Sequence, residues 1–363
     1  MNKPKKSIFK RIIKAILFII LLIVLAFAAL IGVLTVTEYR PDDVVKLKIN
    51  NNTEKEVELG KEISIMSWNI GYGALGDNAD FFMDGGKMVN TATKERLGQN
   101  LKDIEETVKK DNTDIIFFQE MDFHSGRSHY VNEYERMEKA LDNRKASSMT
   151  YNFKVKFLPY PIPPIGHVES GLATFSGYKV DTAERIKLSS PFKWPVKIAN
   201  LKRCLLISRL PIKGSDKELV LVNLHLEAFD DGSGKAAQTK MLKEIMDKEV
   251  AKGNYVIAGG DFNQGFSNID SSSYPIVWDD WVAGLIDQKD IGEDYDMLMD
   301  NSAPTCRSNT KVYAEHRGKG PYQFFLIDGY IVSKNVKINS IKTENLDFKA
   351  SDHNPVIVKF VLE

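Results

Sequence analysis

The pattern of apolar and polar positions separates a continuous apolar segment near the N-terminus from a long alternating remainder. From Ala15 to Val36 the chain carries no charged residue and shows no polar face at the helical period. A helix of this length, at 1.5 Å per residue, extends about 33 Å and can cross a hydrocarbon core of about 30 Å. The pattern therefore predicts one transmembrane helix.

The remainder alternates between short apolar runs, bounded by Gly, Pro, Asn or Asp, and amphipathic stretches. Strands are predicted over Ile63–Asn69, Asp114–Glu120, Phe153–Phe157, Gly171–Phe175, Cys204–Ser208, Leu219–Leu226, Tyr255–Ala258, Phe325–Val332 and Val356–Val361. Helical spacing predicts helices over Lys94–Lys110 and Lys235–Val250. These elements favour a layered α/β domain over residues 61–363, preceded by a tether over 37–60 with one candidate strand, Val44–Ile49. The pattern is weak over 137–149 and 268–302.

Charge adds an orientation to the predicted span. Residues 1–14 carry six Lys or Arg and no acid, so they are expected to remain as a cytoplasmic tail while the domain lies outside. A cleaved signal peptide is the alternative, but its apolar core is usually about 7–15 residues long and ends at a small-x-small site. The longer run here leads into Thr-Val-Thr-Glu-Tyr-Arg, which favours a retained, single-pass anchor in the cell membrane.

Charge and cysteine content also restrict the function. The 49 basic and 49 acidic residues balance overall, but the basic N-terminus leaves an acidic excess of about six after Pro41. An acidic body lacks the basic surface that tight, non-specific duplex binding requires. The two cysteines, Cys204 and Cys306, have no spacing typical of zinc. Either a single disulfide or two buried thiols is compatible with the sequence.

Polar residues of the types used in hydrolysis stand at the ends of the predicted strands, where loops carry chemistry in sheet enzymes. The segments, in order, are Ser67-Trp68-Asn69-Ile70, Gln119-Glu120-Met121-Asp122, Asn223-Leu224-His225-Leu226, Gly259-Gly260-Asp261-Phe262-Asn263, Ile327-Asp328-Gly329-Tyr330 and Ser351-Asp352-His353-Asn354-Pro355. Each alone is a weak motif. Their order and spacing together are specific.

With these six segments, residues 61–363 resemble the endonuclease/exonuclease/phosphatase superfamily, which includes pancreatic deoxyribonuclease, apurinic endonucleases, neutral sphingomyelinases and inositol polyphosphate phosphatases. The resemblance implies a four-layer α/β sandwich, with two facing mixed sheets flanked by helices, and a site at one edge. It also implies a divalent metal, usually Mg²⁺, with Mn²⁺ as an alternative. Among the branches, membrane-anchored bacterial members fit best.

Three residues are expected at the metal. Glu120 follows an apolar strand, where a carboxylate must be paired or ligated, and hard oxygen ligands suit Mg²⁺. Asn69 would add an amide oxygen, unless it only forms a turn before Gly71. Asp352 would complete the site.

Five residues are expected to act on the phosphoester. The resemblance implies that Asp261 orients or deprotonates the attacking water, that Asn263 steadies the phosphate, and that His225 lies against it. His353 would stabilise the developing charge, with Asp328 orienting its ring and keeping it protonated. The structural alternatives are a helix cap or Asx-turn at Asp261 and Asn263, a hydrogen-bonded core position for His225 and a solvated loop position for His353.

Several further segments have two equal interpretations. Arg127, Tyr130 and Asn132 follow Glu120 closely and could contact a phosphate or head group, or lie in a solvated loop. Arg307 could clamp a phosphate or form a surface ion pair. The loops 81–83, 160–165 and 192–195 are apolar or Pro-rich, and if exposed near the site they could enter a membrane surface.

The preferred hypothesis is therefore metal-dependent hydrolysis of a phosphodiester or phosphomonoester by in-line water attack at the outer membrane surface. A lipid head group or small molecule is favoured over nucleic acid as substrate, and no protein partner is predicted. The first alternative is an anchored extracytoplasmic nuclease with the same chemistry. The second is a non-catalytic binding module on a retired enzyme fold.

Overall fold

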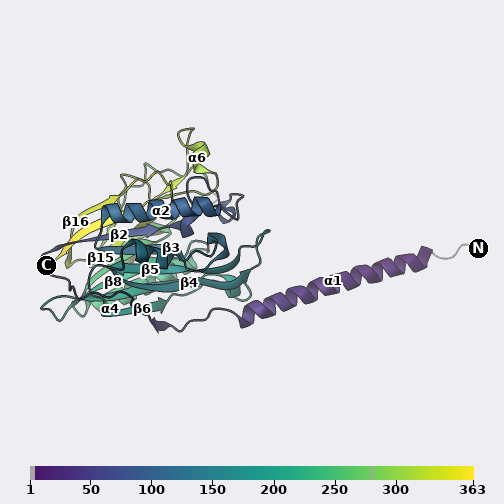
Figure 1. The fold of residues 1–363 in the computed structure, drawn as a ribbon, viewed down its shortest axis with the longest axis horizontal. Helices are drawn as coiled ribbons and strands as arrows, with labels where there is room; N and C mark the ends of the chain where they lie inside the picture. The colour runs from purple at the N-terminus through teal and green to yellow at the C-terminus, as the bar shows by residue number, and fades with distance from the viewer. Residues whose placement is uncertain (1–4, 279–280) are drawn as a thin grey trace, which may run out of the picture.

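Two β-sheets face each other, and helices cover their outer faces (Figure 1). The computed structural model describes residues 5–278 and 281–363. The helix α2 (Lys94–Asp111) packs with α3 (Glu133–Ala140) on one sheet, and α4 (Ser233–Val250) packs on the other. The four-layer α/β sandwich implied by the sequence is thus confirmed.

The first sheet has six strands in the order β16-β17-β2-β3-β5-β4. Its strands are β2 (Glu62–Asn69), β3 (Ile115–Asp122), β4 (Ala146–Leu158), β5 (Gly166–Ser176), β16 (Val336–Thr343) and β17 (Val356–Leu362). Only β2 and β3 are parallel neighbours, so both strands end at the same edge of the sheet.

The second sheet has seven strands in the order β1-β6-β7-β8-β9-β15-β12. Its strands are β1 (Val44–Lys46), β6 (Thr182–Lys187), β7 (Cys204–Pro211), β8 (Glu218–His225), β9 (Tyr255–Asp261), β12 (Tyr295–Leu298) and β15 (Asp328–Ser333). Here β8 and β9 are the parallel pair, and they too end at one common edge.

Short elements complete the loops around these sheets. Two small ladders pair β10 (Gln264–Phe266) with β11 (Gly284–Ile286) and β13 (Cys306–Arg307) with β14 (Phe324–Phe325). The remaining helices are α5 (Gln288–Ile291), α6 (Tyr313–His316) and the 3-10 turns η1 (Gly71–Gly73), η2 (Phe82–Asp84), η3 (Gly126–Ser128) and η4 (Val196–Ala199).

The alternation of side chains along the strands explains the layers. Ile65 of β2 and Phe117 of β3 point into the core between the sheets and meet Leu221 and Ile257 of the second sheet. The intervening residues face outward, where the apolar stripe of α2 covers Ile116 and its neighbours. All of these side chains are fully buried. The short-period pattern in the sequence therefore places one strand face in each apolar layer.

The N-terminal helix α1 (Lys5–Val36) is longer than the predicted span, because helical structure continues through residues expected to form a basic tail. Its segment Phe9–Val36 is long and apolar enough to cross a membrane, with a mean hydropathy of 3.4 over an 18-residue window. A signal sequence near the N-terminus also passes this test. Residues 1–4 of the expected tail lie outside the described residues. In Figure 1, α1 extends away from the domain.

The segment expected to be a tether is instead packed onto the domain. Strand β1 pairs with β6 as an edge strand of the second sheet, and it covers less of Val44–Ile49 than predicted. Further along, Val57 is fully buried and bridges to Ile212. Backbone pairing and a buried valine exclude a free linker over 37–60. The cause is the open edge of β6, whose backbone groups need a partner.

Other differences come from strands with one polar face. The sequence did not predict β6 and β16, whose charged residues alternate with apolar ones. The weak stretch 137–149 contains the end of α3 and the start of β4. The predicted strand Phe325–Val332 is divided into β14 and β15. Cys204 and Cys306 are both buried free thiols, which settles the open question of a disulfide between them.

A buried amide links the two sheets. Asn223 of β8 is fully buried and donates from Nδ2 to the carbonyls of Phe118 (3.2 Å) and Ala173 (2.9 Å) in the first sheet. Its Oδ1 accepts a hydrogen bond of 2.8 Å from Gln119 Nε2. One side chain thus satisfies three buried groups across the interface.

We expect Asn223→Ala to lower the free energy of unfolding by about 2–4 kcal/mol, because it leaves buried polar groups without partners. Denaturant unfolding of the detergent-solubilised chain measures this change. Asn339→Ala is the control, since the Asn339 amide bonds Glu62 at an exposed position and its loss should cost within about 0.5 kcal/mol. Equal losses for the two variants would contradict this account of the interface.

Candidate active site

The predicted catalytic residues meet at the edge where both sheets end. Asn69 ends β2 and His225 ends β8, while Asp261 ends β9 beside it. Since β15 runs antiparallel to β9, its first residue, Asp328, lies opposite Asp261. The loop before β17 brings His353 to the same edge. Topology alone therefore assembles side chains that are up to 284 residues apart.

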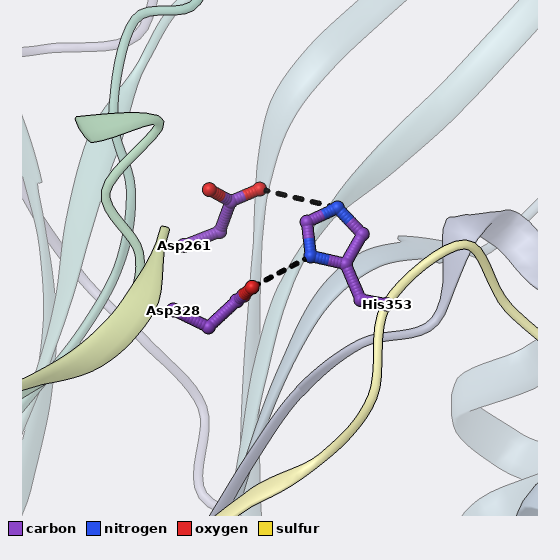
Figure 2. A group of neighbouring side chains, drawn as sticks. All are labelled: Asp261, Asp328 and His353. Atoms are coloured by element: carbon purple, nitrogen blue, oxygen red, sulfur yellow. Dashed lines mark hydrogen bonds and ion pairs between the residues drawn. The ribbon is translucent and has the colours of Figure 1, made fainter. Parts of the chain in front are cut away.

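His353 lies between two carboxylates from the other sheet (Figure 2). Its Nδ1 is 2.8 Å from Asp328 Oδ2, and its Nε2 is 3.8 Å from Asp261 Oδ2. Burial opposes a charge on the ring, but the charge of Asp328, the neighbouring Cys306 and the hydrogen bonds to both together raise the pKa of His353 well above its usual value. The bond to Asp328 fixes the orientation of the ring, and the raised pKa favours its protonated form.

His225 is in the opposite electrostatic state. Burial, together with the positive charges of Arg203 and His353, lowers the pKa of His225 well below its usual value. Its Nε2 lies 3.4 Å from Asp261 Oδ2, and its buried Nδ1 has no hydrogen-bond partner among the described residues. A neutral imidazole and an imidazolium therefore flank the same carboxylate.

Asp261 is the carboxylate shared by both rings. Burial and the nearby charge of Asp328 raise the pKa of Asp261 to about 6, although the positive charge of His353 acts in the other direction. Asn69 donates to Asp261 Oδ2 at 3.0 Å. The backbone N–H of Asn263 donates to Asp261 Oδ1 at 2.9 Å. Both oxygens are thereby oriented, and the group is ionised at neutral pH.

Asn69 and Asn263 use their amides differently from the expectation. Asn69 presents its Nδ2 to Asp261 and to Glu120 Oε1 (3.2 Å), while its Oδ1 accepts the N–H of Gly71 at 3.0 Å. The amide oxygen expected at a metal is therefore engaged in the turn that was the alternative interpretation. Asn263 has a left-handed φ of 52°, and its Nδ2 bonds the carbonyl of Leu226 at 3.0 Å. Both amides fix the site backbone and its carboxylates.

Glu120 is directed toward the site by an irregularity in β3. The pairing of β3 with β5 shifts register between Phe118 and Met121, and Glu120 within this bulge has a left-handed φ of 54°. Such a conformation is uncommon for a residue other than glycine, and bulges often re-aim a side chain beside an active site. Burial, and then the charge of Asp352, raise the pKa of Glu120.

Two residues that the sequence did not single out join these carboxylates. Asn309 Nδ2 donates to Asp352 Oδ2 at 2.6 Å and to Asp84 Oδ2 at 3.0 Å. Burial raises the pKa of Asp84 to about 7. The hydrogen bond from Asn309 acts to lower this pKa, and the negative charges of Asp352 and Glu120 act to raise it by smaller amounts. Asp84 follows the apolar run 81–83 in η2 rather than a predicted strand, so no local pattern marked it.

Glu120, Asp352 and Asp84 form a cluster of carboxylates whose charges act on one another. Their oxygens are hard ligands of the kind that Mg²⁺ prefers. Within residues 5–278 and 281–363, none of the three forms an ion pair with Lys, Arg or His. Clustered carboxylates without cationic partners raise each other's energy, and a metal ion would remove that cost.

A second group of possible ligands is less suited to a metal. Ligand atoms of Asp261, Asp328 and His353 all lie within 4.8 Å of one another. However, His353 already holds a proton that it shares with Asp328, and an imidazole must be neutral to bind a metal. The raised pKa of His353 thus makes this triad better suited to proton transfer than to binding a metal.

The site opens into one cavity of about 510 Å³. Its polar end contains Glu120, His225, Asp261, Asp352 and His353. The rest of its wall is mainly apolar and aromatic, and includes Phe81, Phe82, Met83, Phe153, Leu158, Tyr160, Ile165, Phe192, Leu201, Phe229, Trp278, Trp281 and Phe325. The cavity thus joins a charged reaction centre to an extended apolar surface.

The residues expected to contact a phosphate divide into two groups. Arg127 and Arg307 line the cavity, but Arg127 forms two bonds to Asp122 (3.1 and 2.9 Å) and Arg307 bonds the carbonyls of Leu75 and Gly76. Both guanidinium groups line the cavity, but most of their N–H donors are used in bonds that hold the cavity wall in place.

The other two lie outside the cavity lining. Tyr130 is exposed and packs on His124. Asn132 caps α3 by accepting the N–H of Glu135 at 3.1 Å, so its sequence proximity to Glu120 does not bring it to the site.

Known protein families and solved structures include relatives of this architecture. The Endonuclease/Exonuclease/phosphatase family matches residues 66–353. An endonuclease/exonuclease/phosphatase from Beutenbergia cavernae DSM 12333 has a similar structure, with a TM-score of 0.57 and 14% identity over 83% of this chain and 72% of that one. A protein of the same description from Bacteroides vulgatus has a TM-score of 0.52 and 16% sequence identity, over 84% of this chain and 100% of that one. Among curated proteins, none matches this sequence.

The catalytic domain of human Nocturnin, solved with a bound sulfate anion, gives a TM-score of 0.50 and 16% identity over 87% of this chain and 98% of that one. Fold and site together define a protein of the phosphoester-hydrolysing α/β sandwich class. This chain belongs to the endonuclease/exonuclease/phosphatase family, whose members hydrolyse phosphoester bonds and commonly use divalent metals.

We expect Asp328→Asn to lower the pKa of His353, because the variant removes the charge that holds its proton. The loss of phosphoesterase rate on the alkaline side should then begin at lower pH, and the rate itself should fall about 10- to 100-fold. A pH–rate profile measures both effects. Asp270→Asn, at an exposed position, is the matched control. An alkaline limb that stays in place would show that Asp328 does not set the charge on His353.

Proposed function

We propose that this protein is a Mg²⁺-dependent phosphoester hydrolase, held by α1 in the cell membrane with its catalytic domain outside. The observation that carries the proposal is the arrangement of His225, Asp261 and His353 around one end of the cavity. Glu120 and Asp352 line the same cavity, and among the described residues neither forms an ion pair with a cationic side chain. Mn²⁺ could replace Mg²⁺ on the same oxygen ligands.

The side chains divide the reaction between them. Asp261, oriented by Asn69, accepts the proton of a water whose oxygen attacks phosphorus in line with the leaving oxygen. His353 places a fixed positive charge where the phosphoryl oxygens gain negative charge. The neutral His225 offers a hydrogen bond without competing for the proton of Asp261. The bond to the leaving oxygen breaks, and that oxygen departs with the electron pair and takes a proton from solvent, while Asp261 releases its proton to solvent.

Glu120 and Asp352 would hold the metal, with Asp84 as a further carboxylate beside them. When bound, Mg²⁺ supplies positive charge to the phosphoryl and leaving oxygens. Asn263, Arg127 and Arg307 support the reaction by fixing the walls around the phosphate. Tyr130 and Asn132 remain possible head-group contacts only for a substrate that extends beyond the cavity.

The anchor and its orientation rest on sequence and packing together. The basic residues before the span favour a cytoplasmic N-terminus. Leu34 near the end of α1 is buried against the domain, only 4% exposed, and Thr35 accepts a bond of 3.2 Å from Trp194 Nε1. A helix whose last turn is part of the domain's packing supports a retained anchor rather than a cleaved signal peptide.

The substrate is a phosphoester at the membrane surface, a lipid head group or small molecule in preference to nucleic acid. The apolar cavity wall favours a substrate with an apolar part. The acidic body disfavours the phosphate contacts that nucleic acid requires. An anchored nuclease is the alternative with the same chemistry, and a non-catalytic binding module is the alternative without it.

We expect the rate to fall as the pH falls through about 6, since protonation removes the base at Asp261, whose raised pKa is about 6. Asp261→Asn should lower kcat by about 10²–10⁴-fold. Both are measured on vesicle phospholipids, a soluble phosphodiester and DNA in parallel, with Asp270→Asn as control. Faster Asp261-dependent cleavage of DNA than of the other substrates would favour the nuclease alternative.

Removal of the metal gives an independent test. Chelation should abolish turnover, and added Mg²⁺ should restore it. Glu120→Gln should raise the Mg²⁺ concentration for half-maximal rate at least about tenfold, because one charged ligand is lost. Glu106→Gln, on the exposed face of α2, serves as control. Inactivity of the native protein with Mg²⁺ on every substrate, together with unchanged behaviour of Glu120→Gln, would favour the binding module.

A further inference from the structure

Exposed apolar side chains gather beside the end of α1. Phe157, Tyr160 and Ile162, in and after β4, are 43%, 65% and 94% exposed, and Trp194 and Val196, around η4, are 57% and 59% exposed. We call these five residues the apolar rim. Scattered apolar residues are ordinary on protein surfaces, but a group on two segments in contact indicates a binding surface.

The rim is fixed to the helix rather than attached through a flexible linker. Leu30, Ile31 and Leu34 of α1 pack with Val155 and Ile198 of β4 and η4 in one apolar cluster. The Trp194–Thr35 bond joins the rim to the helix directly. In Figure 1 the β4–β5 hairpin projects on the side of the domain toward which α1 extends. The position of the helix therefore sets the depth of the rim.

The geometry of α1 gives the depth at which the rim lies in the bilayer. Leu30 lies six residues before Val36, which is about 9 Å along a helix. If α1 crosses the bilayer and Val36 lies at the outer membrane surface, the segments packed on Leu30 lie about 9 Å inside that surface. Interfacial segments commonly bury their apolar face about 5–10 Å.

The charges around the rim fit the same location. Lys156, Lys193 and Lys197 are exposed beside the rim residues. Within the described part of the chain, no carboxylate forms an ion pair with any of the three. Lysines that flank apolar side chains suit the head-group region, where they contact lipid phosphates.

The apolar wall of the cavity begins at this surface. Phe153, Leu158, Ile165 and Ala199 pack in the cluster that holds α1, and the same four residues line the cavity. Tyr160 of the rim also lines the cavity, and its ring packs edge-on against Phe82 at 5.7 Å. A continuous apolar surface thus runs from the anchor to the carboxylates at the reaction centre.

We propose that the rim lies in the outer leaflet and that the cavity opens onto it, so that the substrate is a membrane phospholipid that enters sideways. Its hydrocarbon chains follow the wall formed by Phe153, Leu158 and Ile165, and its phosphoester reaches Asp261 and His353. This inference rests on the proposed function and names its substrate class. A protein partner on the rim is the competing occupant.

The first test measures depth. The full chain is reconstituted into vesicles of phosphatidylcholine and phosphatidylglycerol, with a fluorophore on Ile162→Cys or, as control, on Asp216→Cys at an exposed turn. Brominated lipids should quench the first label and aqueous iodide the second. Iodide quenching of both labels to the same extent would overturn the proposed position of the rim.

The second test separates the lipid substrate from the chemistry. In the same vesicles, the double variant Ile162→Asp/Trp194→Asp should lower hydrolysis of the phospholipids at least about tenfold, because charged side chains resist insertion. Hydrolysis of soluble bis-p-nitrophenyl phosphate should stay within about twofold, since neither residue lines the cavity. Val44→Asp/Leu59→Asp, at two other exposed apolar positions, should change neither rate.

The outcomes distinguish the two proposals. Turnover of the soluble diester without turnover of vesicle phospholipid would overturn the lipid inference and leave the hydrolase intact. Equal loss of phospholipid turnover in both double variants would overturn the role of the rim. Failure of the native protein to hydrolyse either substrate with Mg²⁺ would overturn the proposed function, while the quenching pattern would still decide where the rim lies.

Discussion

The catalytic geometry depends on how one sheet is held against the other. Asp261 and Asp328 belong to the seven-stranded sheet, whereas Asn69 and His353 belong to the edge of the six-stranded sheet. The Asn69–Asp261 and His353–Asp328 hydrogen bonds cross that boundary. A small slide between the sheets would break both bonds, so the apolar core between them and the amide of Asn223 maintain the distances on which the chemistry relies.

The two histidines show how position selects protonation. Both rings are buried and both lie near Asp261, but only His353 has a second carboxylate on its other nitrogen. His225 instead has the guanidinium of Arg203 nearby, and its pKa moves in the opposite direction. One pocket therefore contains a fixed cation and a neutral hydrogen-bonding ring, with the shared carboxylate between them.

The sequence predicts most of this site because its residues stand at the ends of strongly apolar strands. The parallel pairs β2–β3 and β8–β9 bring such ends together, so Asn69, Glu120, His225 and Asp261 could be placed without coordinates. Asp84 could not, because only the bond from Asn309, 225 residues away, brings it to the carboxylates. The oxygen of Asn69 and the packing of residues 37–60 depend on local backbone pairing, which periodicity does not report.

The pairing of β2 with β17 has a consequence for how the protein is made. Ser67 of β2 is opposite Val356 of β17, 289 residues further along the chain, inside the six-stranded sheet. Contacts between distant parts of a chain form slowly, because the loop between them must close first. The sheet therefore remains incomplete until residues 356–362 have been made, and the reaction centre, which includes the loop just before β17, cannot assemble earlier. A chain that lacked residues 351–362 would leave β2 with an unpaired edge and the site without His353.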